Sequence, residues 1–308
     1  MSETKKGLTG STLKLIAIGA MFIDHFGATV LEHYLMLHLD QMQAGDGKLM
    51  SIYMIDMVLR LIGRLGFPIF CFLLIEGFGY TRSRGKYAAR LGLFALISEV
   101  PFDLGFNNQI LEFTYQNVFF TLFIGLLTIW GIDAFLKKAD EKLTGTGGAV
   151  LRFVITAVIT AAGMAAGELL RTDYAAIGVG TIVVMYLAKK NERAWLGIMC
   201  AVSVACMAIS YGFAWESWIF GGILLVILLI VFLTAGKRPG NGRTLAAGCG
   251  ILTIAMPVEF TSFATVPIVA SYNGQRGWKL KYVFYLFYPL HILFWYFVCV
   301  CLGIYQPV

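Results

Sequence analysis

Long apolar runs separated by short polar segments make up almost the whole chain. The first run covers residues 13–31. A helix needs about twenty apolar residues to cross a hydrocarbon layer about 30 Å thick, and this run has that length. Similar runs continue to the end of the chain. The pattern predicts an all-α polytopic integral membrane protein, with about ten transmembrane helices in a single bundle around a central cavity.

The ninth apolar run, residues 245–269, differs from the others because proline interrupts it. Pro257 and Pro267 flank Glu259 there. Broken helices at membrane depth occur where they line a cavity rather than lipid, so we expect this run to be kinked or broken and to face the cavity. Of the other expected helices, the second covers residues 52–78, the third ends near 106, the fourth ends at 137 and the fifth starts near 149. The sixth ends at 189, the seventh ends near 211, the eighth covers 218–235 and the last starts near 281.

Composition supports this class and excludes a soluble globular domain. Hydrophobic residues make up 58% of the chain, charged residues 14%, and the mean hydropathy is +0.77. We expect one membrane domain over residues 1–308, with residues 1–12 as a short cytoplasmic tail. His, Cys, Asp and Glu show no metal-ligand spacing, so we expect no metal. We expect no nucleic acid as a partner, and the lipid bilayer as the surroundings.

Basic residues indicate the orientation. Ten crossings place both termini on one side, and by the positive-inside rule that side is the cytoplasm. We therefore expect a multi-pass protein of the bacterial cytoplasmic membrane with both termini in the cytoplasm. Loop 271–279, with Arg276 and Lys279, falls on the opposite side, against the trend. The cytoplasmic side collects the lysines and arginines of segments 5–6, 82–90, 137–142, 189–193 and 237–243.

Asp24 and His25 in the first helix are the strongest candidates for chemistry. His25 lies about 16 Å beyond Lys14 along the helix, near mid-membrane, where an ionisable group costs roughly 3 kcal/mol or more. Such groups usually face a wet cavity or a partner. The eleven residues between Lys14 and His25 turn the helix through about 1100°, which puts both on one face. Adjacent positions do not face each other, so we expect Asp24 to pair with another helix.

The second run carries three charged residues on one face, since Asp56, Arg60 and Arg64 are spaced by four. Asp56 can pair with Arg60, but one carboxylate cannot neutralise two arginines. Arg64 therefore needs an acidic partner from another helix. Glu99 in the third run is our candidate, which predicts a structural ion pair between Arg64 and Glu99.

Further polar side chains lie on faces of later helices. Lys281, Tyr285 and Tyr288 share one face of the last run, and His291 follows one turn beyond Tyr288. Asn117 lies on a face of the fourth run. These side chains can reach a cavity that the first helix also lines.

Six separate segments, from the first helix to the last, carry a family resemblance. They are IDHFG (23–27), GRLGFPIFCFLLIEGF (63–78), KYAARLGLFALISEVPFDL (86–104), DYAAIGVG (173–180), YNGQRG (272–277) and KYVFYLFYPLH (281–291). Together they resemble the TraX family. The resemblance implies an inner-membrane acetyltransferase, since the founding member of that family modifies the N-terminus of a conjugative pilin subunit.

The first helix also resembles the membrane acyltransferase type three family, in which an arginine precedes a catalytic histidine by eleven residues. Lys14 and His25 occupy that spacing here. Lysine keeps the positive charge of arginine and lacks its bidentate fork.

Together these features favour an acyltransferase, with acyl-CoA and most simply acetyl-CoA as the donor. We expect the acyl group to pass from the cytoplasmic side to an amine or hydroxyl at the exoplasmic side. The acceptor is a protein N-terminus, a glycan or a small molecule. Imidazole has an unperturbed pKa of about 6.5, which suits His25 as the general base. The alternative is a proton-coupled secondary transporter that uses the same buried charges.

These expectations assign residues to two groups. The expected catalytic residues are His25, Asp24, His291, Tyr288 and Arg64. The residues expected to bind acyl-CoA are Lys14, Arg82, Arg84, Arg90, Asn117, Arg276, Lys281 and Tyr285.

Overall fold

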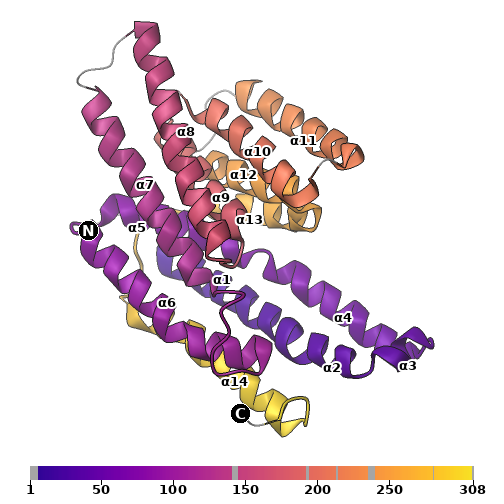
Figure 1. The fold of residues 1–308 in the computed structure, drawn as a ribbon. Helices are drawn as coiled ribbons and strands as arrows, with labels where there is room; N and C mark the ends of the chain where they lie inside the picture. The colour runs from indigo at the N-terminus through magenta and orange to yellow at the C-terminus, as the bar shows by residue number, and fades with distance from the viewer. Residues whose placement is uncertain are drawn as a thin grey trace.

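A computed structural model of the chain describes residues 6–140, 145–191, 194–212, 214–234, 240–279 and 281–306, without the side chains of Asp140 and Lys281. The described residues are helical apart from turns and two isolated β-bridges. In chain order the elements are α1 (Gly10–His25), η1 (Phe26–Leu31), α2 (Glu32–Leu37), α3 (Leu39–Gln43), α4 (Gly47–Gly63), α5 (Gly66–Tyr80), α6 (Arg84–Asn107), α7 (Val118–Asp140), α8 (Gly145–Leu169), α9 (Ala175–Lys190), α10 (Trp195–Tyr211), α11 (Trp215–Thr234), α12 (Gly240–Ala255), η2 (Pro257–Ala264), α13 (Thr265–Ala270) and α14 (Lys281–Cys301) (Figure 1).

The length and apolarity of these helices confirm the all-α membrane class. Within the described chain, six helical segments are long and apolar enough to cross a membrane, and shorter apolar helices accompany them. The six segments are Gly10–Leu37, Gly47–Tyr80, Val118–Ala139, Gly145–Leu169, Trp215–Thr234 and Tyr282–Cys301.

The first long helical segment, Gly10–Leu37, which we call the first rod, changes from α-helical to π-helical immediately after His25. Thr9 caps α1, since its side chain accepts a hydrogen bond from the Thr12 amide. The rod continues as the π-helical turn η1 and then as α2. Thr29 Oγ1 donates to the carbonyl of His25 at 2.5 Å, within this turn. Such wide turns inside helices often occur at functional sites, and this one sets the position of His25.

The last helix, α14, runs parallel to the first rod. Lys14 lies over the ring of Phe284, and further along His25 meets His291. Near the far end, Cys299 Sγ lies 3.4 Å from the carbonyl oxygen of Thr29. Contacts in this order mean that α1 and α14 start at the same end of the bundle.

The ninth apolar run does not cross the bundle but forms a hairpin. Cys249 Sγ in α12 lies 3.3 Å from the carbonyl oxygen of Ser262 in η2, and a Cβ on Gly242 would lie 3.4 Å from that of Ala270. The chain therefore turns back near Pro257 and returns to the end from which α12 started. Proline has no amide hydrogen to donate, which suits it to the turn. The expected break is confirmed, but none of the described residues 245–269 lines the cavity, as we also expected of this run.

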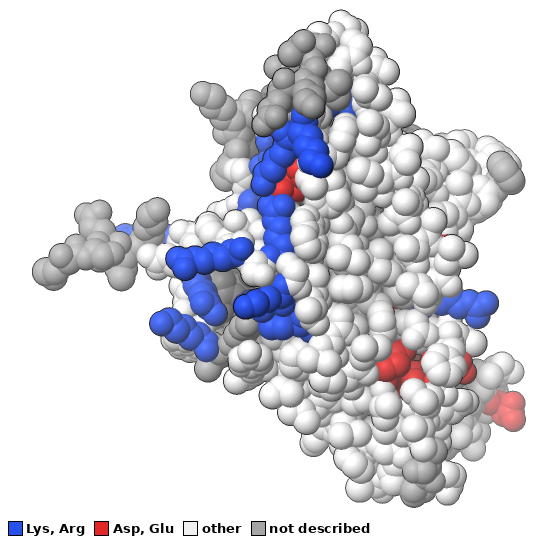
Figure 2. Space-filling view, turned by 60° about the vertical axis from the view of Figure 1, so that its left-hand side comes forward, with Lys and Arg blue, Asp and Glu red and all other residues white. Residues whose placement is uncertain are grey.

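This hairpin overturns the expected placement of loop 271–279. The loop pairs with the start of the chain, since Leu8 N donates to Ser271 O at 2.8 Å and Asn273 N donates to Leu8 O at 2.9 Å. Ser11 N also donates to Arg276 O at 3.0 Å. Residues 7–12 are therefore not a free tail, and α1 already begins at Gly10. Arg276 and Lys279 join the basic end, which removes the exception to the charge pattern. Figure 2 shows Lys and Arg side chains gathered in one area of the surface.

The expectation of ten crossings with both termini on one side is wrong for the same reason. Tyr305 donates its hydroxyl to Gly105 O at 2.9 Å, and its ring packs against His33, at the far ends of α6 and α2. The described N-terminal residues pair with loop 271–279 at the other end. With a hairpin in place of a ninth crossing, the described N-terminal and C-terminal residues lie at opposite ends of the helix bundle.

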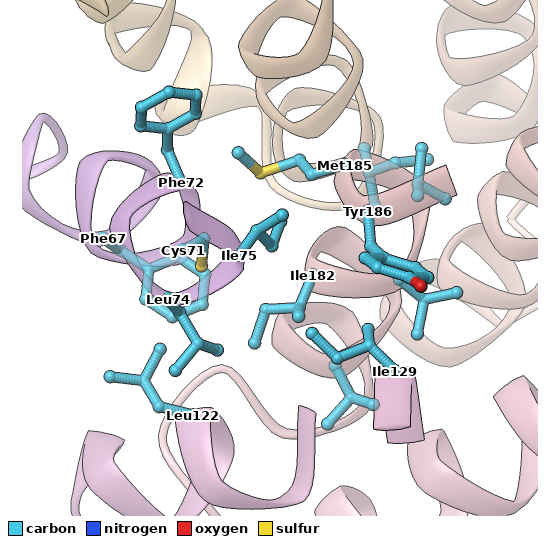
Figure 3. Packing of buried hydrophobic residues seen from close by; sticks show 14 of the residues in the cluster. Phe67, Cys71, Phe72, Leu74, Ile75, Leu122, Ile129, Ile182, Met185 and Tyr186 are labelled. Carbon is cyan, nitrogen blue, oxygen red and sulfur yellow. The ribbon is translucent and has the colours of Figure 1, made fainter. Parts of the chain in front are cut away.

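The apolar core holds the cavity-lining helices together. Phe72 of α5, Leu126 of α7 and Ile182 of α9 are nearly inaccessible, and Figure 3 shows α5 and α9 side chains packed together. Gly125 permits the close contact between α7 and α9, because a Cβ there would lie 2.4 Å from Ile182 Cδ1. Phe67 of α5 belongs to the core and also lines the cavity.

The hairpin predicts which loops share a side of the membrane. In a Cys301→Ser background, Lys86→Cys and Gln275→Cys should react with an impermeant thiol reagent from one side of a sealed membrane. Gln109→Cys should react from the other, because it follows α6 at the far end. Labelling of intact cells and inverted vesicles measures this, and the background alone is the control. Reaction of Gln275→Cys from the same side as Gln109→Cys would contradict the hairpin.

Candidate active site

One cavity of about 830 Å³ lies between the first rod, α4 to α7 and α14. The loops that join α5 to α6, α6 to α7, α8 to α9 and α13 to α14 also line it. It brings together most of the side chains that the sequence singled out. Those that line it are Lys14, Asp24, His25, Arg64, Arg82, Arg90, Arg276, Tyr285 and Tyr288. Segments far apart in the chain thus form one site.

The centre of the site is a pair of histidines from α1 and α14. His25 Nδ1 lies 2.7 Å from His291 Nε2, and the rings stack at 4.8 Å between centroids. Phe106 and Tyr288 meet the edge of the His25 ring. His291 is behind His25, because His25 lines the cavity and His291 does not.

The hydrogen bonds of this pair determine the tautomers of the neutral rings. His291 Nδ1 lies 2.8 Å from the carbonyl oxygen of Phe287, and a carbonyl can only accept, so this nitrogen carries a proton. His291 Nε2 is then an acceptor, and His25 Nδ1 donates to it. The remaining nitrogen, His25 Nε2, has a free lone pair. An imidazole held in this way can accept a proton from a molecule in the cavity.

Asp24 pairs with another helix, α4, as expected. Its partner there is Arg60, which we expected to pair with Asp56. Arg60 Nη1 lies 2.7 Å from Asp24 Oδ1, and Arg60 Nε lies 3.1 Å from Glu32 Oε1. Asp56, the expected partner of Arg60, lies instead against Gly27. Gly63 permits the approach of the two helices, because a Cβ there would lie 2.0 Å from Asp24 Oδ1.

The predicted ion pair between Arg64 and Glu99 is wrong. Arg64 Nη1 lies 3.0 Å from Glu259 Oε1, and Glu259 is fully buried at the tip of the hairpin. Glu99 accepts hydrogen bonds from Asn117, and Asn117 also donates to Ala95 O at 2.9 Å. Asn117 is therefore a buried structural residue outside the cavity lining, not a cavity residue as expected.

The end of the cavity beside residues 80–82 and loop 271–279 is basic and aromatic. Four cations of the described residues line it, together with aromatic rings. Lys14 Nζ lies 5.0 Å from the centre of the Phe284 ring. The cations are Lys14, Arg82, Arg90 and Arg276, and the aromatic residues include Tyr80, Tyr87, Tyr272, Phe284 and Tyr285.

Arg84, which is expected to bind acyl-CoA, does not take part in this lining. Arg84 points to another helix, where its Nη1 lies 2.7 Å from Asp133 Oδ2. Lys137, at 3.0 Å, and Lys190 share the same carboxylate, and Tyr186 donates to it at 2.7 Å. The side chain of Lys281 lies outside the described part of the structure.

Sequence reasoning missed several groups that line the opposite half of the cavity or support it. Arg60 was assigned to Asp56, and Glu259 was noted without a partner. Asp173 and Tyr174 stand in the segment DYAAIGVG, which was a signal, while Tyr115 gave none. Tyr115 donates to Asp173 Oδ1 at 2.6 Å, and Tyr174 stacks on Phe67 at 3.8 Å between centroids.

Comparisons with known proteins place this arrangement in a family. The family model described as TraX protein matches residues 9–299. A curated relative, the probable fimbrial assembly protein FimC, serogroup H1, of Dichelobacter nodosus, is 27% identical over 292 residues, which are 91% of each chain. No solved structure matches the chain.

The pairing of Arg64 with Glu259 predicts non-additive stability. Arg64→Leu or Glu259→Leu alone should lower the free energy of unfolding by about 3 to 5 kcal/mol, because each leaves a buried charge unpaired. The double variant should lose less than the sum. Thermal unfolding in one detergent measures this. The matched control is Arg64→Leu combined with Glu99→Leu, whose effects should add. Additive losses for Arg64 and Glu259 would disprove the pair.

Proposed function

Since the chain belongs to the TraX family, we propose that it is an integral-membrane acyltransferase that takes an acetyl group from acetyl-CoA on the cytoplasmic side. The observation that carries the proposal is the buried histidine pair, with His25 lining a cavity whose one end is basic. An imidazole near a cluster of cations suits a reaction between an anionic donor and a neutral nucleophile.

The basic end of the cavity supports a role in binding the donor. Lys14, Arg82, Arg90 and Arg276 present positive charge to the phosphates of coenzyme A. The aromatic walls between this end and His25 suit the long, uncharged arm that carries the thioester. This end also lies on the side with most lysines and arginines, which is the cytoplasmic side by charge.

In the proposed step, His25 Nε2 takes the proton from the acceptor's nucleophilic N–H or O–H. The acceptor atom attacks the thioester carbonyl carbon, and the carbon–sulfur bond breaks. The coenzyme A sulfur leaves with the bond electrons and takes the proton from His25, so the enzyme ends unchanged. His291 is a positioning residue, because it holds the tautomer of His25 and accepts a hydrogen bond from the imidazolium that forms.

Negative charge on the carbonyl oxygen needs a donor in the same space. Arg64 lines the cavity, and its Nε is buried with no hydrogen-bond partner among the described residues. Tyr288 also lines the cavity, beside the His25 ring. Donors fixed in a water-poor site stabilise such charge more than water does. Asp24 keeps Arg60 in place beside this group.

The acceptor is proposed to enter from the side opposite to the donor. The fimbrial-assembly name of the relative favours a subunit of a surface filament, modified at its N-terminus, over a glycan or a small molecule. A proton-coupled transporter remains the second candidate. Release of coenzyme A from acetyl-CoA distinguishes the two, because a transporter would not cleave the thioester.

His25→Ala should lower the rate of coenzyme A release by a factor of about 10² to 10⁴, because the proton acceptor is lost. Affinity for acetyl-CoA should stay within about threefold, because the phosphates bind at the other end of the cavity. A thiol reagent measures release, and equilibrium binding measures affinity. His291→Phe should lower turnover less than His25→Ala. His38→Ala is the control. Turnover of His25→Ala above a third of wild type would contradict the role of His25.

Arg276→Gln should weaken acetyl-CoA binding about tenfold, which is about 1.4 kcal/mol for one lost charge-assisted contact. Lys279→Gln is the matched control, because it removes the same charge from the same loop but does not line the cavity. The difference should shrink in high salt. Equal affinities of the two variants would contradict donor binding at this end.

A further inference from the structure

Among the described residues, three carboxylates line the cavity, those of Asp24, Glu76 and Asp173. Asp24 is paired with Arg60 and Glu76 with Lys189, whereas Asp173 has no such ion pair. It lies in the short connection between α8 and α9, outside both helices. Asp173 N donates to Gln116 O at 2.8 Å, and Thr121 donates its hydroxyl to Asp173 O. Tyr115 donates its hydroxyl to Asp173 Oδ1 at 2.6 Å. Hydrogen bonds therefore hold both the backbone and the carboxylate of Asp173 in place.

No cation of the described residues forms an ion pair with Asp173, since no Lys, Arg or His nitrogen lies within 4.0 Å of its carboxylate. Among the described cations, Arg64 and then Arg60 have the strongest coulombic effect on Asp173, although the Tyr115 hydrogen bond acts on it more strongly. Each is already engaged, Arg60 with Asp24 and Glu32 and Arg64 with Glu259. Asp173 thus differs from Asp24 and Glu259, because each of those carboxylates forms an ion pair with an arginine.

A carboxylate in a water-poor cavity is costly unless a positive group offsets its charge. The donor cannot supply that group, because its phosphates are negative and belong with Lys14, Arg82, Arg90 and Arg276. The second substrate can supply it. The connection that holds Asp173 pairs with residue Gln116, in the loop at the far ends of α6 and α8, which is the side opposite to the basic end.

We propose that Asp173 binds the positively charged amino group of the acceptor and thereby makes the enzyme prefer amines over alcohols. This inference rests on the proposed function. Asp173 is a specificity-determining residue that binds the ammonium form of the acceptor. The ammonium gives one proton to water before the attack, and the neutral amine then passes an N–H proton to His25 Nε2 and on to the leaving sulfur. The ammonium and acetyl-CoA thus give the amide, the coenzyme A thiol and one released proton. The ammonium group would also meet aromatic faces, because Phe67, Tyr174 and Tyr288 line the same space. The ligand class is a primary amine attached to an apolar chain or segment.

A pair of probes with the same tail isolates the charge. Decylamine and decanol differ in one head group, and binding is measured in lipid nanodiscs with empty nanodiscs subtracted. Wild type should bind decylammonium at least tenfold more tightly than decanol. Asp173→Asn keeps the shape and can still accept from Tyr115, and it should bind decylammonium about tenfold more weakly, with decanol binding unchanged.

Two control variants separate charge from structure. Asp40→Asn removes a carboxylate from an exposed position outside the cavity and should bind both probes like wild type. Tyr115→Phe removes the hydroxyl and keeps the carboxylate, and it should hold decylammonium within about threefold of wild type. Loss of amine binding in Asp40→Asn, or its retention in Asp173→Asn, would overturn the proposal.

Turnover gives a second reading on the same proteins. With acetyl-CoA, wild type should form N-decylacetamide faster than decyl acetate, and Asp173→Asn should lose this preference while it binds acetyl-CoA normally. Equal rates with both probes in wild type, or product from neither while acetyl-CoA is cleaved, would overturn the role of Asp173 alone. No cleavage of acetyl-CoA by wild type would instead overturn the proposed function, and the binding data would still test the ammonium site.

Discussion

The structure depends on the need to neutralise charges that lie between helices and away from water. Arg60 lies in the last turn of α4, and Arg64 lies one turn later at the end of that helix. Both need carboxylates from other parts of the chain. The first rod supplies Asp24 and Glu32, and the hairpin supplies Glu259. An unpaired charge there would cost several kcal/mol, so these pairs determine how α4, the first rod and the hairpin tip are placed against one another.

The same constraint separates the cavity into regions of different charge. Cations remain unpaired by described carboxylates at the end where coenzyme A would bind, and the arginines near His25 are matched by acids. The histidine pair lies between these regions. An anionic donor and a cationic acceptor can then approach from opposite ends and meet at His25, which is the arrangement that a transfer across the membrane requires.

The hairpin of α12, η2 and α13 determines both the partner of Arg64 and the path of the chain that follows it. It brings Glu259 to Arg64 and returns the chain to the side from which it came. Loop 271–279 can therefore place Arg276 at the basic end of the cavity, and α14 starts beside α1 so that His291 reaches His25. A straight ninth crossing would have put Arg276 on the wrong side and reversed α14.

The sequence by itself determined the membrane class, the family resemblance, and the candidates His25, His291, Tyr288, Lys14 and Arg276, because apolar length, ionisable groups in apolar runs and motif segments are local properties. It also indicated the break at Pro257. The tertiary structure decided the partners: Glu259 rather than Glu99 for Arg64, Asp24 rather than Asp56 for Arg60, and Asp133 for Arg84. Helical spacing fixes the face of a side chain within its own helix, but the helix that meets this face depends on packing between distant segments. A proline likewise predicts a break without its direction, and that direction moved loop 271–279 and the described C-terminal end to the sides opposite to those expected.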